Sequence, residues 1–250
     1  MEIDESTEAL HYEAQGRLQA MGNYHRWILR NLERGLGRRV WDAGAGIGLV
    51  SSQVAERVEY LLATEYTEAN IETLRGTFRG ADHVEVAHCD LTAPDESFLL
   101  ERRLDTVIHL DVLEHLEDDA GILALFHRVL VPGGRLLLKV PAHRFLFGTL
   151  DEASLHYRRY GKRDLRAKLE AAGFEVERLR AMNLAAVGPY LLKGRVLKKR
   201  TNFSNSLSGS RLGFYDGIIP WLERVERVVP PPVGLSLVAI ARKPGAGSNE

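Results

Sequence analysis

The sequence predicts an α/β protein in which helices cover both faces of a mostly parallel β-sheet. Short apolar, β-rich runs alternate with helical patterns along most of the 250 residues, and this alternation is typical of parallel strands joined by crossover helices. The first run leads directly into a glycine turn at Gly44–Gly48, and the next three runs each end near an acidic residue. These features favour a layered sandwich with a ligand site at one edge of its sheet.

Seven runs have the composition and the length of β-strands. The first five are separated by spacers long enough for a helix. The sixth follows a helical pattern that ends at Gly173, and the seventh lies close to the end of the sequence. The predicted strands are Arg39–Asp42, Tyr60–Thr64, Val84–Cys89, Thr106–Leu110, Arg135–Val140, Phe174–Arg180 and Leu235–Arg242.

The spacers between these runs carry helical patterns. The clearest one has Asp118 and Asp119 as capping candidates, four apolar residues at helical spacing, and a stop at Pro132–Gly134. The predicted helices are Leu49–Val58, Asn70–Phe78, a short one near Ser97–Arg103, Ile122–Leu130 and Lys162–Ala172.

Two segments lie outside the alternation of strands and helices. Residues 1–37 have apolar positions at helical spacing, interrupted at Gly22–Asn23, which predicts two helices that form a lid. The segment 185–234 separates the sixth strand from the seventh. It is basic at Lys193–Arg200 and polar at Thr201–Ser210. We interpret residues 185–234 as a cap or interaction insertion, residues 38–184 as the ligand-binding core, and residues 235–250 as the last core strand and tail.

The insertion ends in an amphipathic helix predicted for Pro220–Val229. Pro220 suits the first helical turn, and Pro230–Pro232 ends the helix. The apolar side of this helix contains Trp221, Leu222, Val225, Val228 and Val229, and the polar side contains Glu223, Arg224, Glu226 and Arg227.

Composition excludes several classes of protein. Apolar residues make up 45% of the chain, which is enough for a sizeable core, and the net charge is only −1, so no overall field attracts nucleic acid. Cys89 is the single cysteine, which excludes an internal disulfide and a cysteine metal cluster. No apolar run is long enough to span a bilayer, and the acidic start is unlike a signal peptide. We therefore expect a soluble protein of a reducing, cytoplasmic compartment, without a bound metal.

The glycine turn distinguishes between nucleotide-binding proteins. Gly44, Gly46 and Gly48 occupy every second position, and Asp42 lies two residues before the first of them. A dinucleotide fingerprint would place its third glycine where this chain has Leu49, so a dehydrogenase is disfavoured. The alternative is a purely structural turn between a strand and a helix, because glycine is common in any sharp turn.

Polar residues end the next three strands. Glu65 ends the second strand and can accept hydrogen bonds from two ribose hydroxyls, and Asp90–Leu91 at the end of the third could bind an adenine edge. The fourth strand ends at Leu110–Asp111 and continues into Glu114–His115. Taken singly, such an acid is more often a loop residue or a helix cap. Together with the glycine turn after the first strand, these endings on four consecutive strands predict a nucleoside site.

These motifs resemble those of the class I S-adenosylmethionine-dependent methyltransferases. The matching elements are the Asp42–Gly48 turn, Glu65, Asp90–Leu91, Asp111–His115 and the Leu130–Leu136 turn. The resemblance covers about three quarters of the chain, and Pro141–Gly148 with Asp151–Tyr160 is similar to a bacterial small-molecule branch. Trp41 departs from the pattern, because a small aliphatic residue is commoner there.

The resemblance implies a Rossmann-like three-layer sandwich with seven strands, of which the last is antiparallel. It also implies that S-adenosylmethionine is the cofactor. The glycine turn would hold its methionine moiety, Glu65 its ribose and Asp90 its adenine. The full set of cofactor residues implied in this way is Asp42, Gly44, Ala45, Gly46, Gly48, Glu65, Tyr66, Asp90, Leu91, Leu110 and His115.

Methyl transfer requires alignment of donor and acceptor, and a hydroxyl or protonated amine acceptor also requires a base. His156 follows the fifth strand on the ligand side of the sheet and is the predicted base. Asp111 is the second predicted catalytic residue, because it could orient the acceptor. The alternative is that the His156 segment only leads into a helix. His109 lies inside a strand and is predicted to be a hydrogen-bonded core residue. The predicted substrate contacts are Tyr24, His143, Tyr157 and Arg158.

The predicted function is methyl transfer to an O, N or C atom of a small molecule. The alternatives are a regulatory protein that binds S-adenosylmethionine without catalysis, and an enzyme acting on a protein or a lipid-linked acceptor. A nucleic-acid substrate is disfavoured, because Asp111–Glu114 stands where a base-binding tetrad would lie.

The insertion could form a roof over the acceptor, a homodimer contact or a contact with anionic lipid. Glu223 and Glu226 balance Arg224 and Arg227 on its helix. We therefore favour the roof or the homodimer contact over the lipid contact, and we expect the protein to remain in solution beside anionic vesicles.

Overall fold

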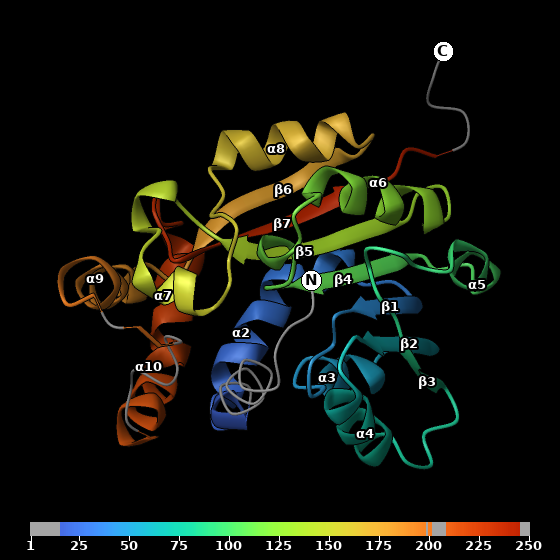
Figure 1. Ribbon diagram of the computed structural model, residues 1–250, viewed down its shortest axis with the longest axis horizontal. Helices are drawn as coiled ribbons and strands as arrows, with labels where there is room; N and C mark the ends of the chain where they lie inside the picture. The colour runs from blue at the N-terminus through green and yellow to red at the C-terminus, as the bar shows by residue number, and fades with distance from the viewer. Residues whose placement is uncertain (1–15, 199, 202–208, 246–250) are drawn as a thin grey trace.

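A seven-stranded sheet forms the centre of the computed structural model, which describes residues 16–198, 200–201 and 209–245 (Figure 1). The strand order is β3-β2-β1-β4-β5-β7-β6. The first five strands pair in parallel, and β7 is antiparallel to both β5 and β6. The strands are β1 (Arg39–Ala43), β2 (Tyr60–Glu65), β3 (Val84–His88), β4 (Thr106–Leu110), β5 (Arg135–Pro141), β6 (Glu175–Met182) and β7 (Ser236–Arg242). The predicted fold class is confirmed.

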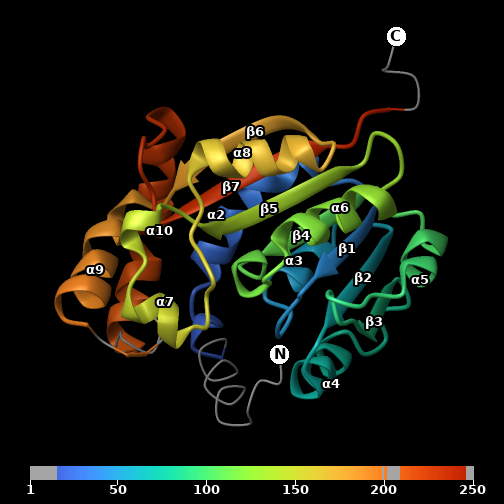
Figure 2. The ribbon, with the colours of Figure 1, turned by 45° about the horizontal axis from the view of Figure 1, so that its top comes forward.

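Helices pack on both faces of this sheet (Figures 1 and 2). One face carries α5 (Glu96–Glu101), α6 (Asp119–Val129) and α8 (Lys162–Ala171), and its core includes the buried Trp41 and Phe126. The other face carries α2 (Gly22–Leu32), α3 (Ser51–Ala55) and α4 (Glu68–Thr77). Apolar residues fill both interfaces, as in other sheets that are covered on two sides.

The strand order determines where a ligand can bind. The chain runs from β1 outward to β3 and then returns to place β4 on the other side of β1. The loops after β1 and β4 therefore diverge, and a crevice opens between them at the carboxyl ends of the strands. The glycine turn, Glu65, Asp90 and Asp111 all follow strands at this edge.

The first predicted helix is shorter in the structure. The prediction was Leu49–Val58, whereas α3 spans only Ser51–Ala55. Gly44, Gly46 and Gly48 all have positive φ angles, so the turn continues past Gly48 before helical geometry begins.

The second predicted N-terminal helix is present as α2, which begins at the predicted break. Its Trp27, Ile28 and Leu32 are buried in the core beneath the sheet, so α2 forms part of the sandwich as well as covering the ligand edge. The apolar positions 10 and 14 of the first predicted helix lie outside the described residues. The role of a lid for residues 1–37 stays a prediction.

The insertion contains η4 (Leu184–Ala186), α9 (Val187–Leu191), a π-helical segment η5 (Leu192–Val196) and α10 (Gly209–Val228). Residue 199 of the predicted basic stretch and residues 202–208 of the polar stretch lie outside the described part of the chain. The contacts of α10 are mainly with α2 (Figure 1).

Two predictions about the helix of the insertion are wrong. It begins at Gly209, so Pro220 lies inside the helix and not in its first turn. The predicted polar side is also divided, since Glu223 and Glu226 are buried while Arg224 and Arg227 are exposed, and Trp221, Val225 and Val228 face solvent. The glutamates can be buried because both have partners on neighbouring elements: Glu223 pairs with Arg30 and Glu226 accepts backbone N–H groups.

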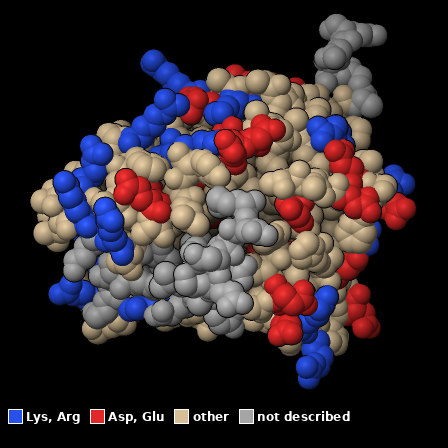
Figure 3. Space-filling view, viewed as in Figure 1, with Lys and Arg blue, Asp and Glu red and all other residues tan. Residues whose placement is uncertain are grey.

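Within the described residues, no helix is both long and apolar enough to cross a membrane. Charged side chains of both signs are spread over the face shown in Figure 3.

Candidate functional site

A cavity of about 760 Å³ lies at the carboxyl ends of β1 to β4. Its walls come from the glycine turn and the loops after β2, β3 and β4, together with α2 and the segment after α7 (Thr149–Ala153). Residues as distant in the sequence as Leu18 and Tyr157 therefore meet around one space. A cavity of this size and position is typical of small-molecule sites in open α/β sheets.

The glycine turn lines the base of this cavity. Gly44 has a φ of +87°, and a Cβ atom there would lie 2.7 Å from the Val112 side chain of the loop after β4. The backbone N–H groups of Gly44 and Ala45 donate to the Thr64 carbonyl oxygen, at 3.1 and 2.9 Å. Position 44 therefore excludes larger residues for two reasons, its conformation and the close approach of Val112.

Two carboxylates follow the neighbouring strands. Glu65 accepts hydrogen bonds from the backbone N–H groups of Gly46, at 2.8 Å, and Tyr66, at 2.9 Å, which fixes the carboxylate against the glycine turn. Asp90 accepts from the Thr92 N–H at 2.8 Å and from its hydroxyl at 2.7 Å. Both acids line the cavity, so their orientation is set by the protein before a ligand arrives.

Asp42 lies below the turn and is almost fully buried. Its carboxylate accepts a hydrogen bond from the Ser51 hydroxyl at 2.5 Å. Burial raises the pKa of Asp42 to about 6, and the charge of nearby Glu65 acts in the same direction. Within the described part of the chain, no cation pairs with Asp42, so the charge of its carboxylate is poorly compensated.

An ion pair between a buried lysine and a half-exposed aspartate borders the cavity on the side of α2. Lys139 of β5 pairs with Asp111, which follows β4 in a left-handed backbone conformation. The Lys139 ammonium also lies 5.7 Å from the centre of the Tyr24 ring. Burial alone would lower the pKa of Lys139, but Asp111 raises it above its ordinary value. Lys139 is therefore cationic, and it holds the Asp111 carboxylate at the cavity wall.

A second polar cluster lies beyond the loop after β4. The rings of His115 and His156 meet edge to face with their centres 4.7 Å apart, and Glu114 lies within the same group. One carboxylate oxygen of Glu114 is buried and has no hydrogen-bond partner among the residues that the structure describes. Burial raises the pKa of Glu114 to about 7, Asp111 adds to this shift, and His156 opposes it.

Asp151 of α7 orients His156. Its carboxylate lies 3.0 Å from Nδ1 of His156 and 2.7 Å from Nε of Arg159. Burial alone would raise the pKa of Asp151, but His156 and Arg159 hold it below its ordinary value. A carboxylate at Nδ1 favours the tautomer in which Nε2 is free to accept a proton.

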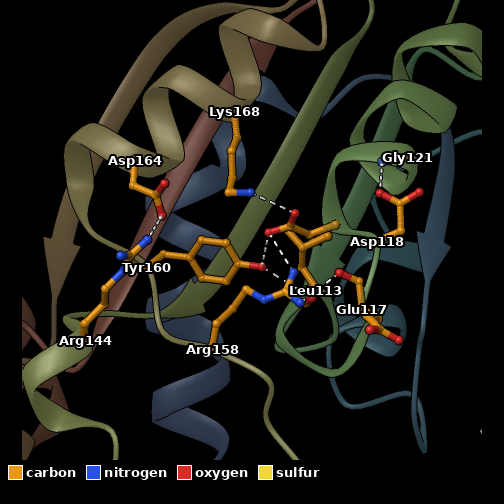
Figure 4. A network of polar contacts seen from close by, with 10 residues as sticks. Leu113, Glu117, Asp118, Gly121, Arg144, Arg158, Tyr160, Asp164 and Lys168 are labelled. Atoms are coloured by element: carbon orange, nitrogen blue, oxygen red, sulfur yellow. Dashed lines mark hydrogen bonds and ion pairs between the residues drawn. The ribbon is translucent and has the colours of Figure 1, made fainter.

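Arg158 is not part of the cavity lining and belongs to a separate network (Figure 4). Its guanidinium lies 3.0 Å from Asp119 and donates to the Glu117 carbonyl oxygen at 2.8 Å. Tyr160 and Lys168 reach the same Asp119 carboxylate, at 3.0 and 2.9 Å. This network attaches the segment after α7 to the start of α6, so it supports the cavity wall from behind.

Comparisons with known proteins agree with this geometry. A family model described as a methyltransferase domain matches residues 41–136. An S-adenosylmethionine-dependent methyltransferase of Mycolicibacterium smegmatis is 32% identical over 151 residues, which are 59% of this chain and 56% of that protein. Residues 41–136 thus match a methyltransferase domain, and the chain is similar to S-adenosylmethionine-dependent methyltransferases.

Two further relatives carry more specific names. A ubiquinone biosynthesis O-methyltransferase of Pseudomonas aeruginosa is 29% identical over 41% of this chain and 44% of its own length. A demethylmenaquinone methyltransferase of Clavibacter sepedonicus is 31% identical over 54% and 55%. The chain thus spans about half the length of the curated relatives it matches. A methyltransferase structure from Thermotoga maritima has the same fold, with a TM-score of 0.60, 15% identity and coverage of 94% of this chain and 97% of that one.

S-adenosylmethionine is the cofactor that this similarity implies, and the cavity suits it. Gly44 leaves space that a Cβ atom would fill, the buried Asp42 faces the cavity and pairs with no cation of the described residues, and Glu65 and Asp90 present carboxylates along the same wall. When bound, the cofactor supplies an electrophilic methyl group. The assignment of each residue to a part of the cofactor stays a prediction.

Most of the predicted site residues line the cavity. These are Tyr24, Asp42, Gly44, Ala45, Gly46, Glu65, Tyr66, Asp90, Leu91, Leu110, Asp111, His115 and Tyr157. Gly48 lies behind the turn against Leu74. His143 stacks on Phe145, and His156 is next to the cavity wall through its contact with His115. His109 is the core histidine expected, with Nδ1 2.7 Å from the Ala43 carbonyl oxygen.

The sequence interpretation missed three residues. His25 lines the cavity beside Tyr24, Lys139 pairs with Asp111, and Asp151 orients His156. Lys139 had a recognisable signal, because a lysine inside an apolar strand requires an acidic partner. His25 had none, since α2 lies far from the other cavity residues in the sequence, whereas Asp151 lies only five residues before His156.

Proposed function

We propose that this methyltransferase transfers the methyl group to an oxygen, nitrogen or carbon atom of a small, largely apolar molecule. One observation supports this most directly. The cavity that contains Gly44, Glu65 and Asp90 continues past Asp111 to a second group of side chains on α2 and after α7. There is thus room for an acceptor beside the predicted cofactor residues.

The acceptor part of the cavity combines apolar walls with aromatic rings. Leu18, Ile28 and Leu155 provide apolar surface, and Tyr24 and Tyr157 add two phenol rings. Such walls favour an acceptor with a planar or hydrocarbon body and few charges. The names of two relatives, which refer to ubiquinone and menaquinone, support a ring of the quinol type.

An acceptor hydroxyl would lose a proton during the transfer. His156, held at Nδ1 by Asp151, is the proposed base, and His115 lies between it and the cavity. Asp111, fixed by Lys139, would orient the acceptor. Transfer to a carbon atom of an electron-rich ring would use the same base to deprotonate a ring hydroxyl.

The test measures S-adenosylhomocysteine formed by the purified protein with S-adenosylmethionine and pooled acceptors. One pool holds quinols, catechols and other phenols, a second holds amines, and a third holds proteins. We expect turnover with the phenolic pool and its loss in the Glu65→Ala variant. Turnover with the protein pool alone would contradict the small-molecule proposal. Binding of S-adenosylmethionine without turnover in any pool would favour a regulatory protein.

A further inference from the structure

All three acidic side chains of the insertion face inward. Asp216 accepts the backbone N–H groups of Asn23 and Tyr24, at 3.2 and 2.9 Å. Glu223 pairs with Arg30 of α2 at 2.7 Å. Glu226 accepts the N–H groups of Asn183 and Leu184, at 3.1 and 2.8 Å. No other acid occurs between residues 185 and 234 of the sequence, so the acids of this segment are used to hold α10 in place.

The outer side of α10 is apolar. Trp221 is 64% exposed and Val228 is 80% exposed, and Phe214 and Val225 are also exposed. Positions 214, 221, 225 and 228 fall at helical spacing, so they form one stripe opposite the buried side of the helix. Trp221 differs in this respect from Trp27 and Trp41, which are fully buried.

A pocket rich in arginine borders this stripe. It has a volume of about 350 Å³ and lies between α2 and α10, lined by Arg26, Arg30, Arg224 and Arg227 together with Asn23, Pro220 and Glu223. Glu223 is the single acid of this lining and already pairs with Arg30. Four guanidinium groups around one acid make a site of net positive charge, which is suited to a phosphate group.

The described residues of the segment 192–200, which precedes α10, also expose apolar and basic side chains. Leu192, Val196 and Leu197 are exposed large apolar residues, and Arg195, Lys198 and Arg200 are exposed cations. Lys and Arg side chains gather over the end of the molecule that carries α9 (Figure 3). In the described part of the insertion, the exposed charges are therefore all positive.

We propose that α10 docks on an anionic lipid surface, with Trp221, Val225 and Val228 entering the interface and Arg224 and Arg227 contacting lipid phosphates. Apolar burial and basic attraction together give more than marginal binding to such a surface. The sequence alone indicated that Glu223 and Glu226 balance Arg224 and Arg227 on the surface of the helix. In the structure both glutamates are buried, so the exposed charge of α10 is positive. A second copy of the chain suits this surface less, because a two-fold contact would bring the same arginines together.

The test is flotation of the full chain with vesicles at physiological salt. One set contains phosphatidylcholine alone, and the other contains phosphatidylcholine mixed with phosphatidylglycerol. We expect flotation only with the second set, together with a blue shift of tryptophan fluorescence. That shift should disappear in Trp221→Phe, because the other two tryptophans are buried. Each lost cation near an anionic surface weakens binding roughly fivefold. Arg224→Glu with Arg227→Glu should therefore weaken flotation by at least about tenfold.

The matched control is Arg163→Glu on α8, an exposed arginine on the opposite side of the sheet. It should float like the wild type, and all variants should keep the affinity for S-adenosylmethionine. Equal flotation of the double variant and the control would overturn the proposal. Tight binding of inorganic phosphate without flotation would also overturn it, because the arginine pocket would then be a site for a soluble anion. A dimer in sedimentation equilibrium that Trp221→Phe dissociates, without flotation, would assign the surface to a second copy.

Discussion

At the scale of single residues, His156 depends on a carboxylate that the sequence does not place beside it. Asp151 is buried, bonds Nδ1 of His156 at 3.0 Å, and also accepts hydrogen bonds from Arg159 and the Gly148 N–H. This arrangement leaves the imidazole one orientation, in which its edge meets His115 at the cavity wall. The two histidines therefore form a path from Asp151 to the cavity.

The role of His156 is tested by His156→Ala. Loss of a general base lowers turnover by about a hundredfold or more, and the affinity for S-adenosylmethionine should not change. Steady-state kinetics and calorimetry measure the two quantities. The control is His127→Ala on α6, a histidine that packs against Phe174 on the far side of the core. A loss of less than about fivefold at saturating acceptor would assign His156 a structural role.

Asp42 gives the folded protein a pH dependence. Its pKa is raised from 3.8 to about 6 in the folded state, so folding favours the protonated form. The associated stability is fully present below about pH 4 and is lost as the pH rises through 6. We expect wild type to lose on the order of 3 kcal/mol relative to Asp42→Asn between pH 4 and pH 7.5. Urea unfolding of the ligand-free proteins measures this difference, and parallel pH profiles would contradict the prediction.

The sequence locates the residues at the strand ends because their positions follow from the topology. Glu65, Asp90 and Asp111 each come directly after a parallel strand, so the order of elements alone brings them to one edge. The sequence does not locate their partners. His25 reaches the site because α2 packs on β7 and α10, which are distant in the sequence, whereas Asp151 meets His156 through a local contact five residues apart.

At the scale of elements, an ion pair joins Lys139 of β5 to Asp111 at the end of β4. Its two members contribute unequally to the free energy of unfolding. The Lys139 side chain is 3% exposed, whereas that of Asp111 is 47% exposed. Removal of Asp111 leaves a cation buried without a partner, but removal of Lys139 leaves a carboxylate that water can reach.

We therefore expect Asp111→Ala to lower the free energy of unfolding by about 3–5 kcal/mol and Lys139→Met by about 1 kcal/mol or less. Urea unfolding at pH 7 compares the two variants. Equal losses of unfolding free energy in the two variants would contradict the prediction. They would mean that water does not stabilise the Asp111 carboxylate when Lys139 is absent.

The orientation of α10 could not be predicted from the spacing of its apolar residues. The spacing of Trp221, Val225 and Val228 shows that they share a stripe, and it does not show which stripe faces the core. The buried side instead contains Glu223 and Glu226, whose partners are on α2 and at the end of β6. Because those partners lie far away in the sequence, burial of the two acids could not be predicted locally.

At the scale of the whole molecule, the sheet and its two helical layers follow from the sequence, whereas the shape of the cavity does not. The strand order reverses between β1 and β4, which opens the crevice. Its closure on the acceptor side requires α2, Leu18 and the segment after α7, all of which lie outside the repeating pattern of strands and helices. The acceptor site thus depends on segments that are added to the common fold.

The central claim is that S-adenosylmethionine binds at the carboxyl ends of β1, β2 and β3, and isothermal titration calorimetry tests it most directly. The wild type should bind one equivalent. Glu65→Ala should weaken binding by about 1–3 kcal/mol, because polar groups of the ligand and of the turn lose their carboxylate partner. Glu68→Ala, an exposed position on the adjacent α4, should bind like the wild type. Equal affinity of all three proteins, or no binding by the wild type, would contradict the account.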